Sequence, residues 1–296
     1  MKNKLISIKN AADLVKDGSV LGLSGFSYMN PPMAIIREII RQKKKNLTIV
    51  SGPTSGIETD ILIGAGCVKK VITSCVSFEQ IAGIAPNFRK AVENQEIELW
   101  ECDEAIWHLA IKAGTYNMPY AVYRGGIGSD IPSLNKDIEV IKYYGKKYLR
   151  IPAIKIDTAI IHAGIADEYG NVQFSNNIFL GRTYCEKEIG LNANQVIASV
   201  EHIVPHEKIL RNPQNTILSN VNVTKARFGC HPGASNGYYM PDLKHYKEYT
   251  KAAEDTRINK TNTFQKYLDK YVYGVKNHDE YLKIIGVNRL LDMEYY

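Results

Sequence analysis

The chain of 296 residues lacks any apolar run long enough to cross a bilayer, and its 5 cysteines include no CxxC pair. A membrane-spanning helix needs about 20 predominantly apolar residues. An odd number of cysteines without metal-ligand spacing argues against a disulfide framework and against a cysteine-based zinc site. The N-terminal segment MKNKLISIKNAADLVKDG is basic but lacks the apolar core of a signal peptide. These absences predict a cytoplasmic protein with reduced thiols and no membrane association.

Several familiar functional motifs are also missing. The chain has no G-x-S-x-G nucleophile elbow, no Walker A sequence and no complete G-x-G-x-x-G fingerprint. The net charge of +6 includes short lysine clusters such as 43–45 and 146–147, which are too diffuse to indicate nucleic-acid binding without a recognised motif. His202 and His206 have the spacing of metal ligands on a helix, but Pro205 between them would break that helix. We therefore expect no metal, no permanently bound cofactor and no nucleic-acid partner.

Short apolar segments alternate with amphipathic segments along most of the chain. We expect strands at 19–23, 47–50, 68–75, 157–163 and 195–200, and helices among them at 33–42, 57–63 and 182–194. Strands that alternate with helices indicate a parallel sheet covered on both faces. The expected fold is therefore α/β, with an open, mainly parallel, Rossmann-like sheet and helices on both faces. No linker is apparent, so we expect one domain over 1–296 with a helical C-terminal extension at 243–296.

The strongest candidate site lies in the segment IELWECDEAIWHLAIKAGTYNMPYAVYRGGIGSDIP, at residues 97–132. A short strand is followed by a helix that begins near Glu104, and the pattern at 120–123 is typical of the next strand. The glycine turn after that strand contributes Arg124, Gly126 and Gly128. Because the ends of parallel strands open onto one crevice, we expect Glu104 and Arg124 to face a shared ligand.

A second group of candidates lies at the ends of earlier strands. The strand at 19–23 ends in Ser24-Gly25-Phe26 before a helix, and such turns expose N–H groups that bind anions or oxyanions. Gly25 and Phe26 are therefore expected to shape a substrate pocket, although an ordinary tight turn would also explain Gly25. Ser77 lies at another strand end, where it either faces the same pocket or is a plain loop serine.

Four segments, taken in order, resemble the α-type subunits of class I coenzyme A transferases. They are Asp17-Gly18 followed by Gly25-Phe26, DTAIIHA at 157–163, His231-Pro232 followed by Gly237-Tyr238-Tyr239, and the tail KNHDEYLKIIGVNRL. The resemblance implies small acyl-CoA and carboxylate substrates, and a β-type partner subunit that carries the nucleophilic glutamate. Coenzyme A would then be bound as a substrate thioester. The match departs from the family signature at Ser24 and Asn30, where that signature has glycine.

Residues 102–132 are more similar to a second branch of the same superfamily, the two-subunit hydrolases that open a ring in CoA thioesters. That branch has an Asp-Glu pair at the start of this helix, matched here by Asp103-Glu104. Its Arg-x-Gly-x-Gly-Ser sequence ending in proline is matched by Arg124 to Pro132. The resemblance implies active-site roles for Glu104 and Arg124. Glu104 could act as a general base, orient the substrate or complement the helix dipole, and Arg124 could bind a carboxylate or pair with Asp103.

Three functions are compatible with these patterns. The first is the α subunit of a heteromeric acyl-CoA:carboxylate CoA-transferase, and the second is a subunit of a CoA-thioester hydrolase that uses Glu104 and Arg124. The third is a non-catalytic ligand-sensing module, similar in fold to the effector domains of sugar-responsive repressors. Such repressors carry an N-terminal helix-turn-helix, for which the segment before the strand at 19–23 leaves no room. We therefore expect an enzyme subunit.

Overall fold

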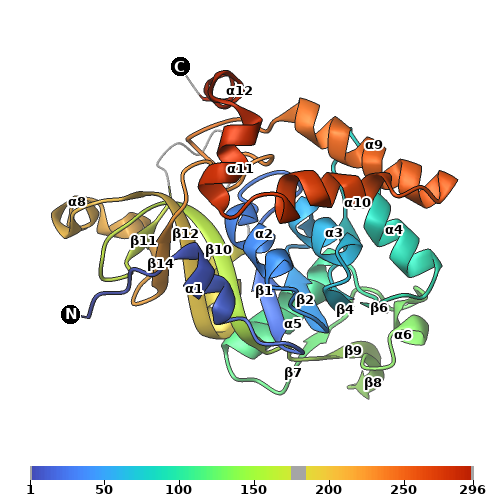
Figure 1. Cartoon of the computed structure of the whole chain (residues 1–296). Coiled ribbons are helices and arrows are strands. Elements are labelled where there is room, and N and C mark those ends of the chain that lie inside the picture. Colours follow the sequence, from blue (N-terminus) through green and yellow to red (C-terminus); the bar gives the residue numbers. More distant parts are fainter. Residues whose placement is uncertain (1, 175–184, 295–296) are drawn as a thin grey trace.

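A nine-stranded sheet forms the centre of the described chain, residues 2–174 and 185–294 of a computed structural model (Figure 1). Its strands are β1 (Val20–Leu23), β2 (Leu47–Ser51), β4 (Val68–Ile72), β6 (Glu98–Trp100), β10 (Ile156–Ala166), β11 (Val172–Gln173), β12 (Ala193–Ile203), β13 (Thr216–Leu218) and β14 (Asn222–Lys225). The order is β13-β11-β10-β1-β2-β4-β6, and β12 pairs with both β10 and β14. Among these strands only β11 and β13 are antiparallel to their neighbours. The mainly parallel sheet predicted from the sequence is confirmed.

Helices cover both faces of this sheet. The helices α1 (Ile8–Asp13), α2 (Met33–Arg41) and α3 (Ile57–Gly64) share one hydrophobic core with β1 and β2, while α5 (Glu104–Thr115) and α7 (Glu186–Asn192) belong to a second core. The central strand β2 is consequently buried along its whole length. The predicted helix at 182–194 corresponds to α7, and its first residues, 182–184, lie outside the described residues. No helix in the described ranges is both long and apolar enough to cross a membrane.

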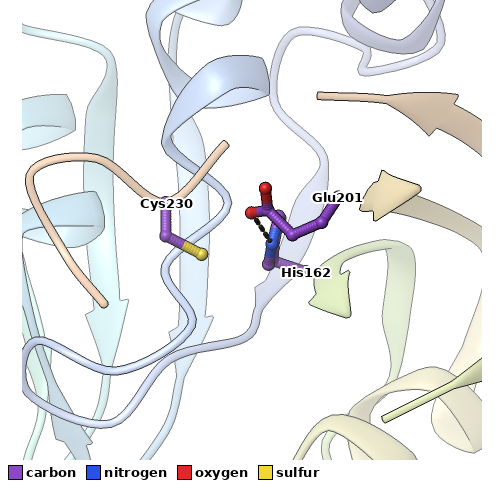
Figure 2. A group of neighbouring side chains, drawn as sticks. All are labelled: His162, Glu201 and Cys230. Carbon is purple, nitrogen blue, oxygen red and sulfur yellow. Dashed lines mark ion pairs between the residues drawn. The ribbon is translucent and has the colours of Figure 1, made fainter. Parts of the chain in front are cut away.

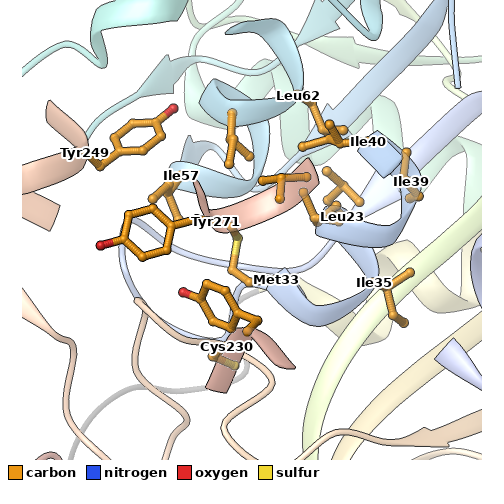
Figure 3. Close-up of a cluster of buried hydrophobic side chains, with 14 of the residues drawn as sticks. Leu23, Met33, Ile35, Ile39, Ile40, Ile57, Leu62, Cys230, Tyr249 and Tyr271 are labelled. Atoms are coloured by element: carbon orange, nitrogen blue, oxygen red, sulfur yellow. The ribbon is translucent and has the colours of Figure 1, made fainter. Parts of the chain in front are cut away.

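The C-terminal helices extend the first of these cores. They are α9 (Leu243–Asn259), α10 (Thr263–Leu268), a π-helical segment (Asp269–Tyr273), α11 (His278–Ile285) and α12 (Val287–Leu291). Figure 3 shows Tyr249 and Tyr271 from this region beside Met33 of α2 and Ile57 of α3. The helix α4 (Pro86–Glu93) packs against both α3 and α9. The apolar face of α2 is thus covered by the extension as well as by the sheet.

A second, smaller sheet corrects one expectation. The segment β7 (Tyr120–Tyr123) does not join the parallel sheet; it pairs antiparallel with β9 (Lys146–Pro152), which in turn pairs antiparallel with β8 (Glu139–Tyr143). Buried Leu149 and Ile151 of β9 place this sheet against α5. The prediction that 120–123 is the next strand of the parallel sheet is therefore wrong, because β7 pairs with β9, whose Leu149 and Ile151 are buried, while Tyr120 and Val122 of β7 stay exposed.

Short elements complete the chain. Strands β3 (Thr54–Ser55) and β5 (Cys75–Val76) form a parallel pair just beyond the ends of β2 and β4. The helices α6 (Ile131–Leu134) and α8 (His206–Leu210) and a 3-10 turn (Pro213–Asn215) lie in connections between strands. The pair β3–β5 extends the carboxyl edge of the sheet, where ligands bind in open α/β folds.

Candidate active site

The turn that follows β1 is held in place by buried polar groups. The Ser24 hydroxyl donates to the carbonyl of Asn30 (2.9 Å) and accepts from the backbone N–H of His162 (3.0 Å). Gly25 has a φ of +130°, a conformation that side-chain-bearing residues rarely adopt. The backbones of Phe26 and Met29 exchange two hydrogen bonds, which close the loop. The sequence of β1 therefore ends in a rigid glycine turn at the carboxyl edge of the sheet.

A buried carboxyl group, Glu58 in the first turn of α3, lies against this glycine turn. Its Oε1 accepts hydrogen bonds from the hydroxyls of Ser51 (3.2 Å) and Ser55 (2.8 Å) and from the N–H of Gly56 (2.7 Å). Its Oε2 is buried without a hydrogen-bond partner among the described residues. A Cβ atom added to Gly25 would lie 3.3 Å from the Glu58 carboxyl carbon. Burial raises the pKa of Glu58 above its usual value, which favours the neutral acid under the turn.

Ser77 joins the same edge from the next strand pair. The backbone N–H of Ser77 donates to the carbonyl of Ser55 (2.9 Å), and its hydroxyl accepts from the N–H of Glu79 (3.0 Å). The Ser27 hydroxyl, in turn, donates to the Glu79 carboxylate, while the Ser27 N–H donates to the carbonyl of Thr54 (2.9 Å). The turns after β1, β3 and β5 are therefore tied to one another. The structure thus brings Gly25 and Phe26 to the same edge of the sheet as Ser77, from a distant part of the chain.

Glu104 is the first residue of α5, at the tip of the edge strand β6. The preceding Asp103 is the N-cap residue, because its carboxylate accepts from the N–H of Ile106 (2.7 Å). Glu104 itself is exposed, and within the described ranges no hydrogen bond or ion pair engages its carboxylate. The helix is capped by its neighbour, so the carboxylate of Glu104 is not needed for that purpose. It remains available to a ligand or a water molecule.

The glycine turn after β7 packs against the start of α5. Gly126 and Gly128 have φ values of +74° and +91°. A Cβ added to Gly126 would lie 3.5 Å from Cδ1 of Ile106, in the first turn of the helix that begins at Glu104. Arg124 is exposed and lines a pocket of about 440 Å³. The structure therefore brings the turn of Arg124 beside the start of α5, but in the part of the chain that it describes no ion pair joins Arg124 to Glu104 or to Asp103.

A buried polar cluster lies between β10, β12 and the loop that contains Cys230 (Figure 2). Nε2 of His162 is 2.9 Å from Oε1 of Glu201, and its Nδ1 is 2.9 Å from the Ser199 hydroxyl. Oε2 of Glu201 accepts from the N–H of Phe228 (2.7 Å), and Oε1 accepts from the Tyr239 hydroxyl (2.8 Å). Cys230 is the third possible metal ligand of this group, and burial raises its thiol pKa far above the usual value. The histidine and the carboxylate are already hydrogen-bonded, so the cluster is better suited to joining the strands than to holding a metal.

Sequence reasoning missed Glu58 and Glu79. In the sequence Glu58 is an ordinary first-turn acid, and its only signal is the pair of serines at 51 and 55. Glu79 follows a strand end without any motif, and it has a left-handed φ of +49°. Glu58 bonds to groups near it in the chain, and only its position under Gly25 depends on the alignment of β1 and β2. Glu79 meets its distant partner Ser27 only when the turns after β1 and β5 come together.

The whole chain is similar to known proteins of one enzyme family. Residues 5–231 match the family model of coenzyme A transferase. The chain is 32% identical to the A-type chain of the 3-oxoadipate CoA-transferase of Pseudomonas knackmussii, over 94% of this chain and 96% of that protein. It is 27% identical to the cholesterol ring-cleaving hydrolase IpdA subunit of Rhodococcus jostii, over 95% of each. It also spans 64% of the length of an uncharacterized protein of Archaeoglobus fulgidus with 32% identity.

The crystal structure of glutaconate coenzyme A-transferase from Acidaminococcus fermentans superposes on this chain with a TM-score of 0.90 and 27% sequence identity. The superposition covers 99% of this chain and 96% of the crystallised one. The family match extends from the residues just before α1 to the loop that contains His231. With the glycine turn at the tip of β1 and the parallel sheet beneath it, the chain belongs to the coenzyme A transferase family, as an α-type subunit.

Proposed function

We propose that this chain is the α subunit of a heteromeric acyl-CoA:carboxylate CoA-transferase and that it forms part of the acyl-CoA pocket. The observation that carries the proposal is the near full-length correspondence with α-type chains of CoA-transferases, joined to a rigid glycine turn at the carboxyl edge of the sheet. The nucleophilic glutamate would come from a β-type partner. Coenzyme A would be a substrate, bound as its thioester.

In this reaction the partner's glutamate carboxylate attacks the thioester carbonyl, and the coenzyme A thiolate leaves. The thiolate then attacks the glutamyl carbonyl of the resulting mixed anhydride, which releases the first carboxylate and leaves a glutamyl-CoA thioester. An acceptor carboxylate then attacks the glutamyl-CoA thioester, and the same steps in reverse give the new acyl-CoA and the free glutamate. The oxyanion formed at each attack needs fixed N–H donors, a role that we assign to Gly25 and to the turn at Gly126–Gly128. The N–H of Phe26 already donates to the carbonyl of Met29, so Phe26 would shape the pocket and not bind the oxyanion.

We assign the remaining candidates by their positions. Ser77 would contact the acyl group beside the Gly25 turn, because its backbone is bonded to the same β3 segment. Arg124 would bind a substrate carboxylate, since its guanidinium is exposed beside a pocket and has no acidic partner among residues 2–174 and 185–294. Glu104 would orient the acyl substrate or a water molecule from the start of α5. We also propose a cytoplasmic location, because all 5 cysteines are free thiols, which persist in reducing compartments.

One observation favours a second candidate, a CoA-thioester hydrolase. Glu104 is exposed and is not the N-cap of its helix, so its carboxylate is available to activate water. In that case Glu104 would be the general base and Arg124 would hold the substrate or stabilise the oxyanion.

The deciding experiment is co-expression with a β-type partner, to be sought in the neighbouring reading frames, followed by an acyl-CoA/acetate exchange assay. Transfer predicts that borohydride or hydroxylamine traps a glutamyl-CoA thioester on the partner. Acyl-CoA hydrolysis without exchange and without a trapped thioester would contradict transfer and support the hydrolase.

A further inference from the structure

The hairpin that joins β8 to β9 lies at the lower right of Figure 1, and cationic side chains line a pocket beside it. Tyr144 and Gly145 form the turn with φ values of +44° and +72°, the left-handed pair typical of a tight two-residue hairpin. The pocket of about 440 Å³ is lined by Arg124, Ile127, Gly145, Lys146 and Lys147. The tight turn fixes the positions at which the two lysines leave the backbone.

The cations of this pocket are not neutralised by acids of the described chain. Arg124, Lys146 and Lys147 take part in no ion pair within residues 2–174 and 185–294, whereas Arg150 of the same strand is paired with Glu139. Lys147 also lies directly opposite Lys142 in the antiparallel pair. Like charges at opposing positions destabilise a hairpin, and a bound anion would relieve that repulsion. The charge arrangement therefore favours a ligand with several negative charges.

Two exposed aromatic rings border the same turn. Tyr143 is 62% exposed and Tyr144 is 87% exposed. Their ring centroids are 4.5 Å apart at an interplanar angle of 86°, so the rings meet edge to face. An exposed tyrosine ring of this kind offers a face for stacking a base, which contributes about 1–3 kcal/mol in nucleic-acid-binding proteins. Aromatic faces beside cations of this kind are suited to a nucleotide.

The hairpin pocket and the start of α5 are linked through the turn that contains Arg124. Arg124 and Gly126 belong to one turn, and a Cβ on Gly126 would be 3.5 Å from Ile106 at the start of α5. An elongated ligand could therefore place a charged nucleotide at the hairpin while its other end extends toward Glu104. A coenzyme A thioester has this construction, with an adenine nucleotide at one end and the reactive thioester at the other.

We propose that the β8–β9 hairpin binds the nucleotide end of the coenzyme A thioester, with the phosphates on Lys146 and Lys147 and the adenine on Tyr144. This inference rests on the proposed function, because it assigns the nucleotide of that substrate to this chain and not to its partner. Arg124 lines the hairpin pocket and belongs to the same turn as Gly126, so it connects the nucleotide site to the candidate active site.

The test compares an acyl-CoA with the matching acyl-pantetheine thioester, which lacks the nucleotide, in the complex with the β-type partner. The double variant Lys146→Glu/Lys147→Glu is expected to raise KM for acyl-CoA about tenfold or more, with little change in kcat. Tyr144→Ala is expected to raise KM for acyl-CoA about fivefold to tenfold, because the stacking of adenine on the tyrosine ring is lost. Neither variant should change kcat/KM for acyl-pantetheine. The control Lys43→Glu/Lys44→Glu makes the same change of net charge in the loop between α2 and β2.

A binding measurement separates this inference from the proposed function. Calorimetric titration of the complex with 3′-phosphoadenosine 5′-diphosphate is expected to give binding that weakens about tenfold in the lysine double variant. If the complex shows no acyl transfer or hydrolysis but binds the nucleotide through this hairpin, only the proposed function fails. Unchanged nucleotide affinity in both variants would overturn the inference. Equal losses with acyl-CoA and acyl-pantetheine would also overturn it, as would loss of partner association with normal nucleotide affinity.

Discussion

The hydroxyl of Tyr249 donates a hydrogen bond of 2.6 Å to Asp60, although 189 residues separate the two in the chain. Asp60 also accepts from the side chain of Asn87 (3.0 Å) and from the backbone N–H of Phe88 (2.7 Å). Burial raises the pKa of Asp60 to about 6, so the carboxylate is ionised above that pH and depends on these donors. This group links α3, α4 and the C-terminal helix α9.

Tyr249→Phe should therefore destabilise the protein. Removing one donor from a buried, ionised carboxylate is expected to lower the free energy of unfolding by about 1.5–3 kcal/mol at pH 7.5. Urea denaturation measures this change. Tyr116→Phe is the matched control, because Tyr116 is 71% exposed, and equal stabilities of the two variants would contradict the prediction.

Two buried histidines predict a dependence of stability on pH. Burial lowers the pKa of His231 to about 4 and that of His278 to about 3, whereas both would have their usual value near 6.5 in the unfolded chain. The unfolded state therefore binds more protons below pH 6.5, and the stability contributed by the neutral rings is lost as the pH falls. A positively charged His278 would also lie beside Arg37, whose guanidinium is 3.2 Å from its Nδ1.

His278→Gln isolates this effect. The variant should be less stable than the wild type at pH 7.5, and the difference should shrink by about 1.4 kcal/mol at pH 5.5, because only the wild type then loses stability to His278 protonation. Urea titrations at the two pH values give the difference. A gap that is constant with pH would contradict the prediction, and the exposed His202, changed to Gln, provides the control.

Gly25→Ala should damage both the fold and the site. Alanine would be strained at a φ of +130°, and its Cβ would lie 3.3 Å from the Glu58 carboxyl group. We expect a loss of about 1–3 kcal/mol in stability and a fall of about 100-fold in kcat as the oxyanion-binding turn moves. Gly83→Ala is the control, because a Cβ there meets no atom within 4 Å. Normal turnover of Gly25→Ala would remove this turn from the chemistry.

Glu104→Gln tests the acid at the start of α5. Since Asp103 caps the helix, stability should change by less than about 0.5 kcal/mol, while kcat should fall by about 10²–10⁴ if Glu104 is a general base. Thermal denaturation and steady-state kinetics measure the two effects. Asp279→Asn, in the first turn of α11, is the matched control for a helix-dipole role. Full activity of Glu104→Gln would contradict a catalytic role, and Glu104 would then only complement the helix dipole.

The pattern of apolar residues along the sequence predicted most of the main sheet but less of the candidate site. The strands β1, β2, β4, β10 and β12 and the helix α5 lie where the alternation of apolar segments places them, because their periodicity is a property of neighbouring residues. The glycines at 25, 126 and 128 were also visible as turn residues, and all three have positive φ values. The C-terminal segment is helical as its amphipathic pattern indicates.

The chain's own sequence thus determined its α/β class, its family and the candidates Gly25, Phe26, Ser77, Glu104 and Arg124. Tertiary structure alone decided that β7 pairs with β9 outside the parallel sheet, since strand pairing depends on which apolar faces can be buried together. It also decided that Glu58 lies beneath Gly25, because the serines that hold the carboxyl and the turn that covers it meet only after β1 and β2 align. The lysines at the β8–β9 hairpin became recognisable as a candidate site for the same reason: whether an acid of the described chain neutralises them is a property of the folded surface.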